Sequence, residues 1–131
     1  MRLLLDTNVL LFGALGELPK EADALINDLG NEVHYSSAAI WEITIKARSG
    51  KLELNMPTKA FENELLRQGY RPLGIAPEHA HQTAFLIDVP GHKDPFDRIM
   101  VAQSICEGML LVTTDQALAA YGQTVRVVGR R

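Results

Sequence analysis

Short apolar runs alternate with helical segments along this chain, and that alternation is typical of an α/β fold built on a parallel sheet. The runs at 2–5 and 109–113 are apolar almost throughout, as expected of central strands that are buried on both faces. Two more β-prone runs occupy 33–36 and 125–128. Because helical segments connect these runs, we expect right-handed crossovers that place helices on both faces of the sheet. The length predicts a single domain over residues 1–131.

Prolines, glycines and small polar residues mark the ends of the predicted helices. A helix over 38–49 has a serine before it and Gly50 after it. A second strong helix runs over 95–107, with Asp94 as its cap and Gly108 as its stop. Further helices are predicted over 7–15, 19–29, 57–69, 77–87 and 115–121, and a loop over 88–93.

Four acidic residues stand where these strands end or these helices begin. They are Asp6, Glu42, Asp97 and Asp115, and Asp94 precedes Asp97 by one helical turn. In a parallel sheet such positions share one edge, where open α/β folds bind ligands. Gathered carboxylates repel one another and resist ionisation, and a hard divalent cation relieves both effects. The spacing therefore favours a metal-dependent enzyme, with Asp94 as the helix cap and Asp97 projecting over the sheet edge.

Each acid also has a purely structural explanation. Asp6 and Asp115 can cap the helices that follow them. Glu42 can form a surface pair with Lys46, four residues further on, worth roughly 0.2–0.5 kcal/mol. Helix capping explains acids at helix starts but not an acid in the middle of a helix, as at Glu42. We therefore favour the metal-site interpretation.

Composition limits the remaining choices. The four acids contribute −4 to a formal net charge of −3, which leaves +1 for the rest of the chain and neither excludes nor favours nucleic acid. Cys106 is the single cysteine, so no internal disulfide can form, as suits a cytoplasmic protein. No apolar stretch reaches the length of a membrane span. The four histidines follow no metal-ligand spacing, which favours Mg²⁺ or Mn²⁺ over zinc, although the loop could bring His92 near the site.

Four stretches around the acids occur in a characteristic order. They read Leu-Leu-Leu-Asp-Thr-Asn at 3–8, Ser-Ala-Ala-Ile-Trp-Glu-Ile at 37–43, His-Lys-Asp-Pro-Phe-Asp-Arg at 92–98 followed by Val-Ala-Gln at 101–103, and Leu-Val-Thr-Thr-Asp at 111–115. Together they resemble the PIN-domain ribonucleases, and most closely the VapC-type toxins of bacterial toxin–antitoxin pairs. The four stretches span nearly the whole chain, and their combination is much more specific than any one of them.

The resemblance implies a PIN-like three-layer α/β/α fold with a central, mainly parallel sheet flanked by helices. It also implies a Mg²⁺- or Mn²⁺-dependent endoribonuclease that hydrolyses RNA phosphodiester bonds. The family's catalytic and metal-binding acids fall on Asp6, Glu42, Asp97 and Asp115, with Asp94 as a further possible ligand. Asn8 and Thr113 match polar positions that support the acids. We add Arg98 and Lys46 as candidate contacts to substrate phosphates.

The same resemblance implies partners. We expect an RNA substrate, a cognate antitoxin protein whose arginine would enter the acidic cleft, and a homodimer. A set of apolar residues is suited either to a partner surface or to the core: Trp41, Ile45, Leu52, Leu54 and Met56.

Two other classes of protein remain as alternatives. A phosphoryl-transfer protein using Asp6, of the haloacid-dehalogenase or receiver type, needs a second acid close to the first, and the sequence Asp6-Thr7-Asn8 lacks it. A non-catalytic RNA-binding PIN-like module would have no use for four acids whose burial is costly.

Overall fold

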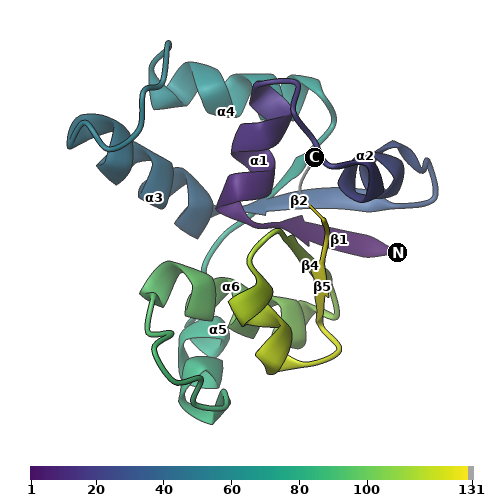
Figure 1. Cartoon of the computed structure of the whole chain (residues 1–131), viewed down its shortest axis with the longest axis vertical. Coiled ribbons are helices and arrows are strands. Elements are labelled where there is room, and N and C mark those ends of the chain that lie inside the picture. The colour runs from purple at the N-terminus through teal and green to yellow at the C-terminus, as the bar shows by residue number, and fades with distance from the viewer. Residues whose placement is uncertain (130–131) are drawn as a thin grey trace.

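Five parallel strands form one sheet in the order β3-β2-β1-β4-β5 (Figure 1). The computed structural model describes residues 1–129, so the last two residues of the predicted 1–131 domain lie outside the described range. The strands are β1 (Arg2–Leu5), β2 (Glu32–Ser36), β3 (Arg71–Leu73), β4 (Leu110–Thr113) and β5 (Val125–Val127).

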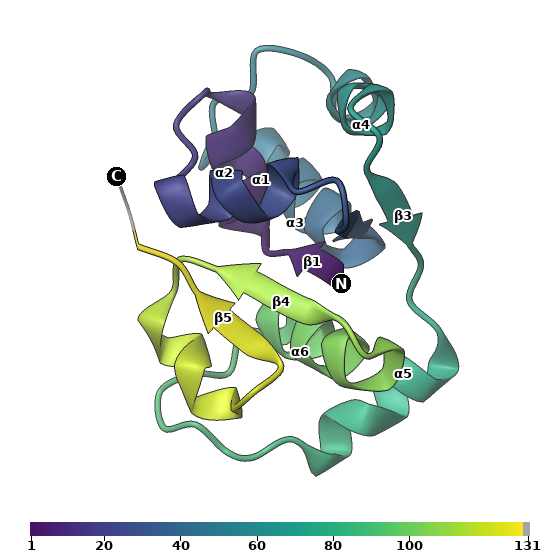
Figure 2. The same ribbon diagram turned by 90° about the vertical axis from the view of Figure 1, so that its right-hand side faces the viewer.

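Helices cover both faces of this sheet and complete the predicted three-layer α/β/α arrangement. They are α1 (Thr7–Ala14), α2 (Lys20–Asn27), α3 (Ser37–Arg48), α4 (Thr58–Arg67), α5 (Pro77–Gln82) and α6 (Pro95–Glu107), with the 3₁₀ helices η1 (Thr83–Phe85) and η2 (Gln116–Tyr121). Figures 1 and 2 show α1 to α4 on one side of the sheet and α5 and α6 on the other. Among the described residues, no helix is both long and apolar enough to cross a membrane.

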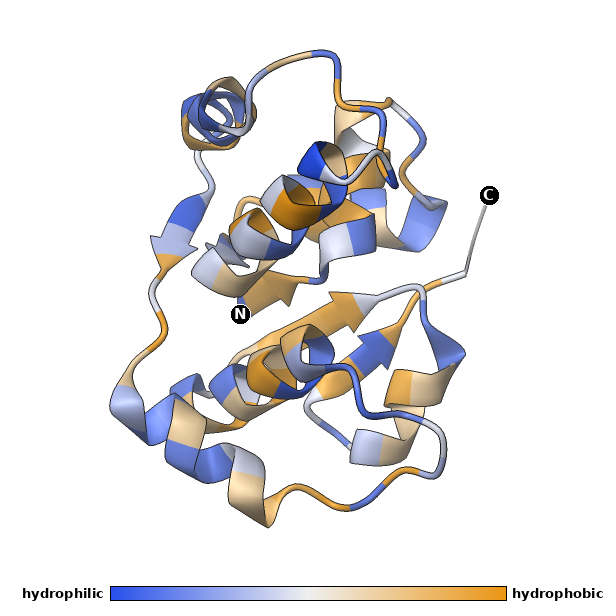
Figure 3. Cartoon of the chain, turned by 90° about the vertical axis from the view of Figure 1, so that its left-hand side faces the viewer, coloured by the Kyte–Doolittle hydropathy of each residue, from blue (hydrophilic) through white to orange (hydrophobic). Residues whose placement is uncertain are grey.

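The two central strands form the core of the domain. Leu3, Leu4 and Leu5 of β1 and Leu111 and Val112 of β4 are at most 1% exposed. The middle of the sheet accordingly appears as a hydrophobic band in Figure 3. Burial of such apolar surface stabilises a fold by roughly 25 cal/mol per Å², so these strands hold the residues at their ends in fixed positions.

Several element boundaries differ from the sequence-based prediction. Strand β3 was not predicted, because it contains Pro72, which cannot donate to a sheet ladder; β3 lies at the sheet edge, where proline is tolerated. The helix predicted over 77–87 ends as α-helix at Gln82 and continues only as η1. The helix predicted over 115–121 is the 3₁₀ helix η2, and α2 ends at Asn27 rather than near residue 29.

Parallel pairing brings the carboxyl ends of the central strands to one edge. Leu5 of β1 is level with Tyr35 of β2 and with Val112 of β4. Just beyond Leu5, the backbone N–H of Asp6 donates to the carbonyl of Val112 at 2.9 Å. The first residue after β1 is therefore fixed against the end of β4, where the next acid follows.

Candidate metal centre

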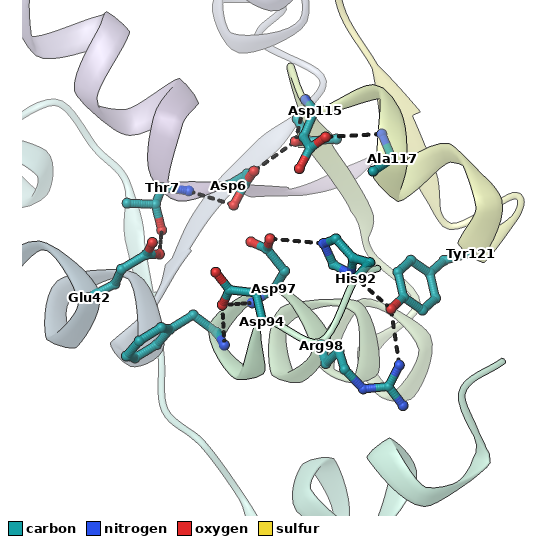
Figure 4. A network of polar contacts seen from close by, with 12 residues as sticks. Asp6, Thr7, Glu42, His92, Asp94, Asp97, Arg98, Asp115, Ala117 and Tyr121 are labelled. Carbon is teal, nitrogen blue, oxygen red and sulfur yellow. Dashed lines mark hydrogen bonds and ion pairs between the residues drawn. The ribbon is translucent and has the colours of Figure 1, made fainter. Parts of the chain in front are cut away.

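The four predicted acids gather at the carboxyl edge of the sheet (Figure 4). Asp6 follows β1, Asp115 follows β4, and Asp97 lies in the first turn of α6. Glu42 comes from the middle of α3, which begins directly after β2. Residues that are far apart in the sequence thus point toward a common space.

Asp6 is the most constrained of the acids. Its side chain is only 3% exposed, and both carboxylate oxygens accept hydrogen bonds. Oδ1 accepts from the backbone N–H of Thr7 at 2.8 Å, and Oδ2 accepts from the hydroxyl of Thr113 at 2.7 Å. Burial raises the pKa of Asp6; the two hydrogen bonds oppose that rise, while Glu42 and Asp115 add to it. The fold therefore fixes the orientation of this carboxylate but leaves its negative charge poorly compensated.

Glu42 pairs with Lys46, the basic residue four positions further on. Its Oε2 accepts from Lys46 Nζ at 2.6 Å, and its Oε1 accepts from the Thr7 hydroxyl at 2.6 Å. The hydrogen bond to Glu42 raises the pKa of Lys46. Glu42 is nevertheless buried, at 5% exposure, so this pair is not the surface pair considered from the sequence. Because Thr7 adjoins Asp6, the same turn orients two acids.

Asp94 and Asp97 divide their roles as the sequence suggested. Asp94 is the N-cap of α6: its Oδ1 accepts from the backbone N–H groups of Phe96 and Asp97 at 2.9 and 3.3 Å. Asp97 instead directs its carboxylate to His92, whose Nε2 lies 3.2 Å from Oδ2. The Asp97 side chain is 16% exposed and lies over the sheet edge.

Asp115 is tied to Asp6 through a single threonine. The backbone N–H of Asp115 donates to Thr113 Oγ1 at 3.0 Å, and the same hydroxyl donates onward to Asp6. Asp115 also caps η2 by accepting from the N–H of Ala117 with one oxygen, Oδ1. Ligand atoms of His92, Asp97 and Asp115 all lie within 4.8 Å of one another, close enough for one ion to touch them.

Asp97 is crowded by four other acids. Burial, together with the negative charges of the neighbouring acids, raises its pKa to about 8; these acids are Asp6, Asp94, Glu42 and Asp115. Such a strongly perturbed carboxyl group, next to like charges at a ligand-binding edge, is characteristic of functional sites. An opposite charge bound here would lower the pKa of Asp97 again.

The residues predicted to support the acids or to bind substrate have different surroundings in the structure. Thr113 contacts two acids, as described above. Asn8 is exposed, and its side chain makes no hydrogen bond to an acid within residues 1–129. Arg98 is turned inward: it donates to Tyr121 Oη at 3.0 Å and to the carbonyls of Ile87 and Thr83 at 3.3 Å. Its guanidinium is half-buried and already has three hydrogen-bond partners.

Sequence reasoning missed two contributors, Thr7 and Tyr121. Thr7 follows Asp6 directly, and the signal for it was its position at N1 of a helix whose cap is an acid. The Tyr121 hydroxyl forms a hydrogen bond of 3.1 Å with His92 Nδ1, and nothing in the sequence around Tyr121 indicated that contact. The loop that carries His92 does bring it to the site.

We predict that Thr113→Val destabilises the fold by about 1–3 kcal/mol, because it removes the donor to a buried carboxylate oxygen of Asp6. Thr114→Val provides the matched control, since the Thr114 hydroxyl is buried without a hydrogen-bond partner. Denaturant unfolding of the two variants in EDTA should separate them. Equal stability of the two variants would contradict the role given to Thr113.

The fold and site define an α/β protein with a cluster of acids at the carboxyl edge of a parallel sheet. Residues 3–123 match the PIN domain family, and the chain belongs to that family. The ribonuclease VapC16 of Mycobacterium tuberculosis is 36% identical over 62 residues. That alignment covers 47% of this chain and 43% of the relative, less than half the relative's length.

Solved structures show the same fold over nearly the whole chain. VapBC2 from Rickettsia felis, bound to a DNA fragment from its promoter, has a TM-score of 0.72 and 14% identity and covers 100% of both chains. A toxin–antitoxin complex from Klebsiella pneumoniae has a TM-score of 0.67 and 20% identity and covers 95% of this chain and 96% of its own. At these identities the likeness concerns the fold alone.

Proposed function

We propose that the chain is a divalent-metal-dependent endoribonuclease whose acids are Asp6, Glu42, Asp97 and Asp115. The observation that carries the proposal is the convergence of these four side chains, with a pKa of about 8 at Asp97. Membership of the PIN domain family and the similarity to a ribonuclease of Mycobacterium tuberculosis support the same activity.

The donor set fits Mg²⁺ or Mn²⁺. Hard divalent cations prefer carboxylate oxygens, and the cluster offers them from four directions. A bound cation would also oppose the burial and the like charges that raise the pKa of Asp97, because an opposite charge favours the ionised form. Asp6, Asp97 and Asp115 would hold the ion, while Glu42 is already balanced by Lys46.

A bound divalent ion supplies Lewis-acid chemistry, lowering the pKa of a coordinated water and stabilising charge on the phosphate. The chain's own residues orient the site. Thr7 and Thr113 fix the two oxygens of Asp6, and Thr113 also fixes the backbone of Asp115. Lys46, which pairs with Glu42 of this cluster and is partly exposed, can contact a substrate phosphate.

The phosphoryl-transfer alternative through Asp6 has less support. Proteins of that class need a second acid close to the first, whereas Asp6 is followed by Thr7 and Asn8. A module that only binds RNA is also disfavoured, because buried carboxylates are costly unless they serve a ligand.

Cleavage assays on RNA with unpaired loops provide the test, because unstacked bases are the usual targets of sequence-specific RNA recognition. We expect cleavage with Mg²⁺ or Mn²⁺, complete loss with EDTA, and recovery when the ion is restored in excess. Undiminished cleavage in EDTA by protein stripped of metal would reject the proposal.

We further propose that this nuclease acts as the toxin of a toxin–antitoxin pair in the cytoplasm. The similar solved structures include a toxin–antitoxin complex, and the curated relative is a VapC ribonuclease. A hollow of about 520 Å³ is lined by Trp41, Ile75, Phe96 and Ile99, and also by Lys93 and Arg98. Trp41 is 61% exposed and meets Phe96 edge-on, with ring centroids 5.2 Å apart. We assign this hollow to an apolar antitoxin segment.

The apolar residues named from the sequence divide between two environments. Trp41, Ile45 and Met56 are exposed, whereas Leu52 and Leu54 pack against the core. Sedimentation with the product of the neighbouring gene should yield a complex that Trp41→Ala weakens and Leu29→Ala, at a fully exposed site, leaves intact. No complex with that product would reject the toxin role. The same measurement on the chain alone tests the expected homodimer.

A further inference from the structure

The structure holds a closed ring of side-chain contacts around His92. From Asp97 the contacts pass to His92 at 3.2 Å, to Tyr121 at 3.1 Å, and from Tyr121 to Arg98 at 3.0 Å. Arg98 directly follows Asp97 on α6, so the ring begins and ends on one turn of helix (Figure 4). A loop residue and a residue of η2 are thus joined to the first turn of α6.

One assignment of hydrogens satisfies every contact in this ring. Arg98 has only donors, so Tyr121 Oη accepts from it. In this assignment the tyrosine hydroxyl donates to His92 Nδ1, and the imidazole hydrogen lies on Nε2. That hydrogen points at Asp97 Oδ2. The arrangement matches the outer hydrogen bonds that orient carboxylate ligands in metal sites.

The loop before α6 holds His92 in this position. The backbone N–H of His92 donates to the carbonyl of Val89 at 2.9 Å, which closes a tight turn over Pro90 and Gly91. Gly91 has φ +76°, as the third residue of a type II turn requires, and proline is favoured just before it. His92 itself is 10% exposed and packs edge-on against Tyr121, with ring centroids 5.7 Å apart.

We propose that His92 is a positioning residue, which holds the Asp97 carboxylate in the orientation the metal site needs and is itself fixed by Tyr121 and Arg98. This inference rests on the proposed function, since Asp97 is taken as a metal ligand. It assigns Arg98 to the support of the site rather than to the substrate. Tyr121 contributes without facing the acids, through the orientation of the imidazole ring.

Three variants test the inference. His92→Leu removes the donor, His92→Gln keeps an N–H donor near the position of Nε2, and Tyr121→Phe removes only the hydroxyl that fixes the ring. We expect His92→Leu to weaken Mn²⁺ binding by about 10- to 100-fold, as loss of such outer partners does. His92→Gln should recover much of that loss, and Tyr121→Phe should cause a smaller one.

Mn²⁺ affinity is measured by calorimetric titration of the full chain, and the tautomer by ¹⁵N chemical shifts of His92 in metal-free protein. The inference predicts hydrogen on Nε2, with the preference reduced in Tyr121→Phe. Wild-type affinity in His92→Leu would overturn it. Equal losses in the Gln and Leu variants would also overturn it, because imidazole would then be a ligand itself. Asp6→Asn, measured alongside, distinguishes failure of this inference from failure of the proposed metal site. If Asp6→Asn also leaves Mn²⁺ binding unchanged, the proposed metal site fails.

Discussion

Asp6→Asn is expected to lower the rate of Mg²⁺-dependent RNA cleavage by a factor of about 10³ or more. Loss of a metal-centred stabilisation worth several kcal/mol corresponds to that factor, at about 1.4 kcal/mol per tenfold change. We expect the largest effect at Asp6 because it is the most buried of the four acids and the one that Thr7 and Thr113 both orient. Its replacement removes a negative charge, and the new amide nitrogen cannot accept from Thr113.

The same variant should remain folded. Burial and neighbouring acids raise the pKa of Asp6, so its charge opposes folding when no ion is bound. Asp28→Asn is a suitable control, because Asp28 is an exposed aspartate just before the amino end of β2, at the opposite edge of the sheet. Cleavage rates and thermal unfolding of both variants, measured in parallel, separate loss of chemistry from loss of fold. A folded Asp6→Asn protein that cleaves at the wild-type rate would contradict the assignment.

Asp97→Asn is expected to stabilise the metal-free protein at alkaline pH. The pKa of Asp97 is about 8 in the folded protein and about 3.9 when unfolded. Between these values the folded state binds more protons, so the free energy of unfolding falls as pH rises from about 4 to about 8. Asparagine has no proton to lose and keeps an oxygen that can accept from His92.

In EDTA, the stability advantage of Asp97→Asn over wild type should therefore grow between pH 5 and pH 8.5, by roughly 2 kcal/mol or more, since one pKa unit corresponds to about 1.4 kcal/mol. Denaturant unfolding at the two pH values measures it, with Asp28→Asn as a control that should show no such growth. Excess Mn²⁺ should reverse the order, because the ion binds the wild-type site more tightly and stabilises what it binds. An advantage that is independent of pH would show that Asp97 is not the crowded acid.

Much of this fold could be predicted from local pattern. The buried strands β1 and β4 have apolar residues at nearly every position, and α6 has a proline at its first position, an aspartate cap and a left-handed glycine as its stop. These signals depend on neighbours in the sequence. Strand β3 has no such signal: three residues with a central proline form a strand only because the edge of β2 is available.

In the candidate site, too, local sequence indicates some residues and not others. The four acids could be found from the sequence because strand ends and helix starts of a parallel sheet share an edge. Their partners could not, since Thr113 reaches Asp6 across 107 positions and Tyr121 reaches His92 across 29. The direction of Arg98 is likewise set by its contacts with Thr83 of η1 and Tyr121 of η2, which its place in the sequence does not indicate.

The most direct test of the metal centre is diffraction from crystals grown with Mn²⁺, recorded where manganese scatters anomalously. The account predicts an anomalous peak among the carboxylate oxygens of Asp6, Asp97 and Asp115, and none there in crystals of Asp6→Asn. A well-ordered site without manganese at saturating concentration, or manganese bound only elsewhere on the chain, would contradict it.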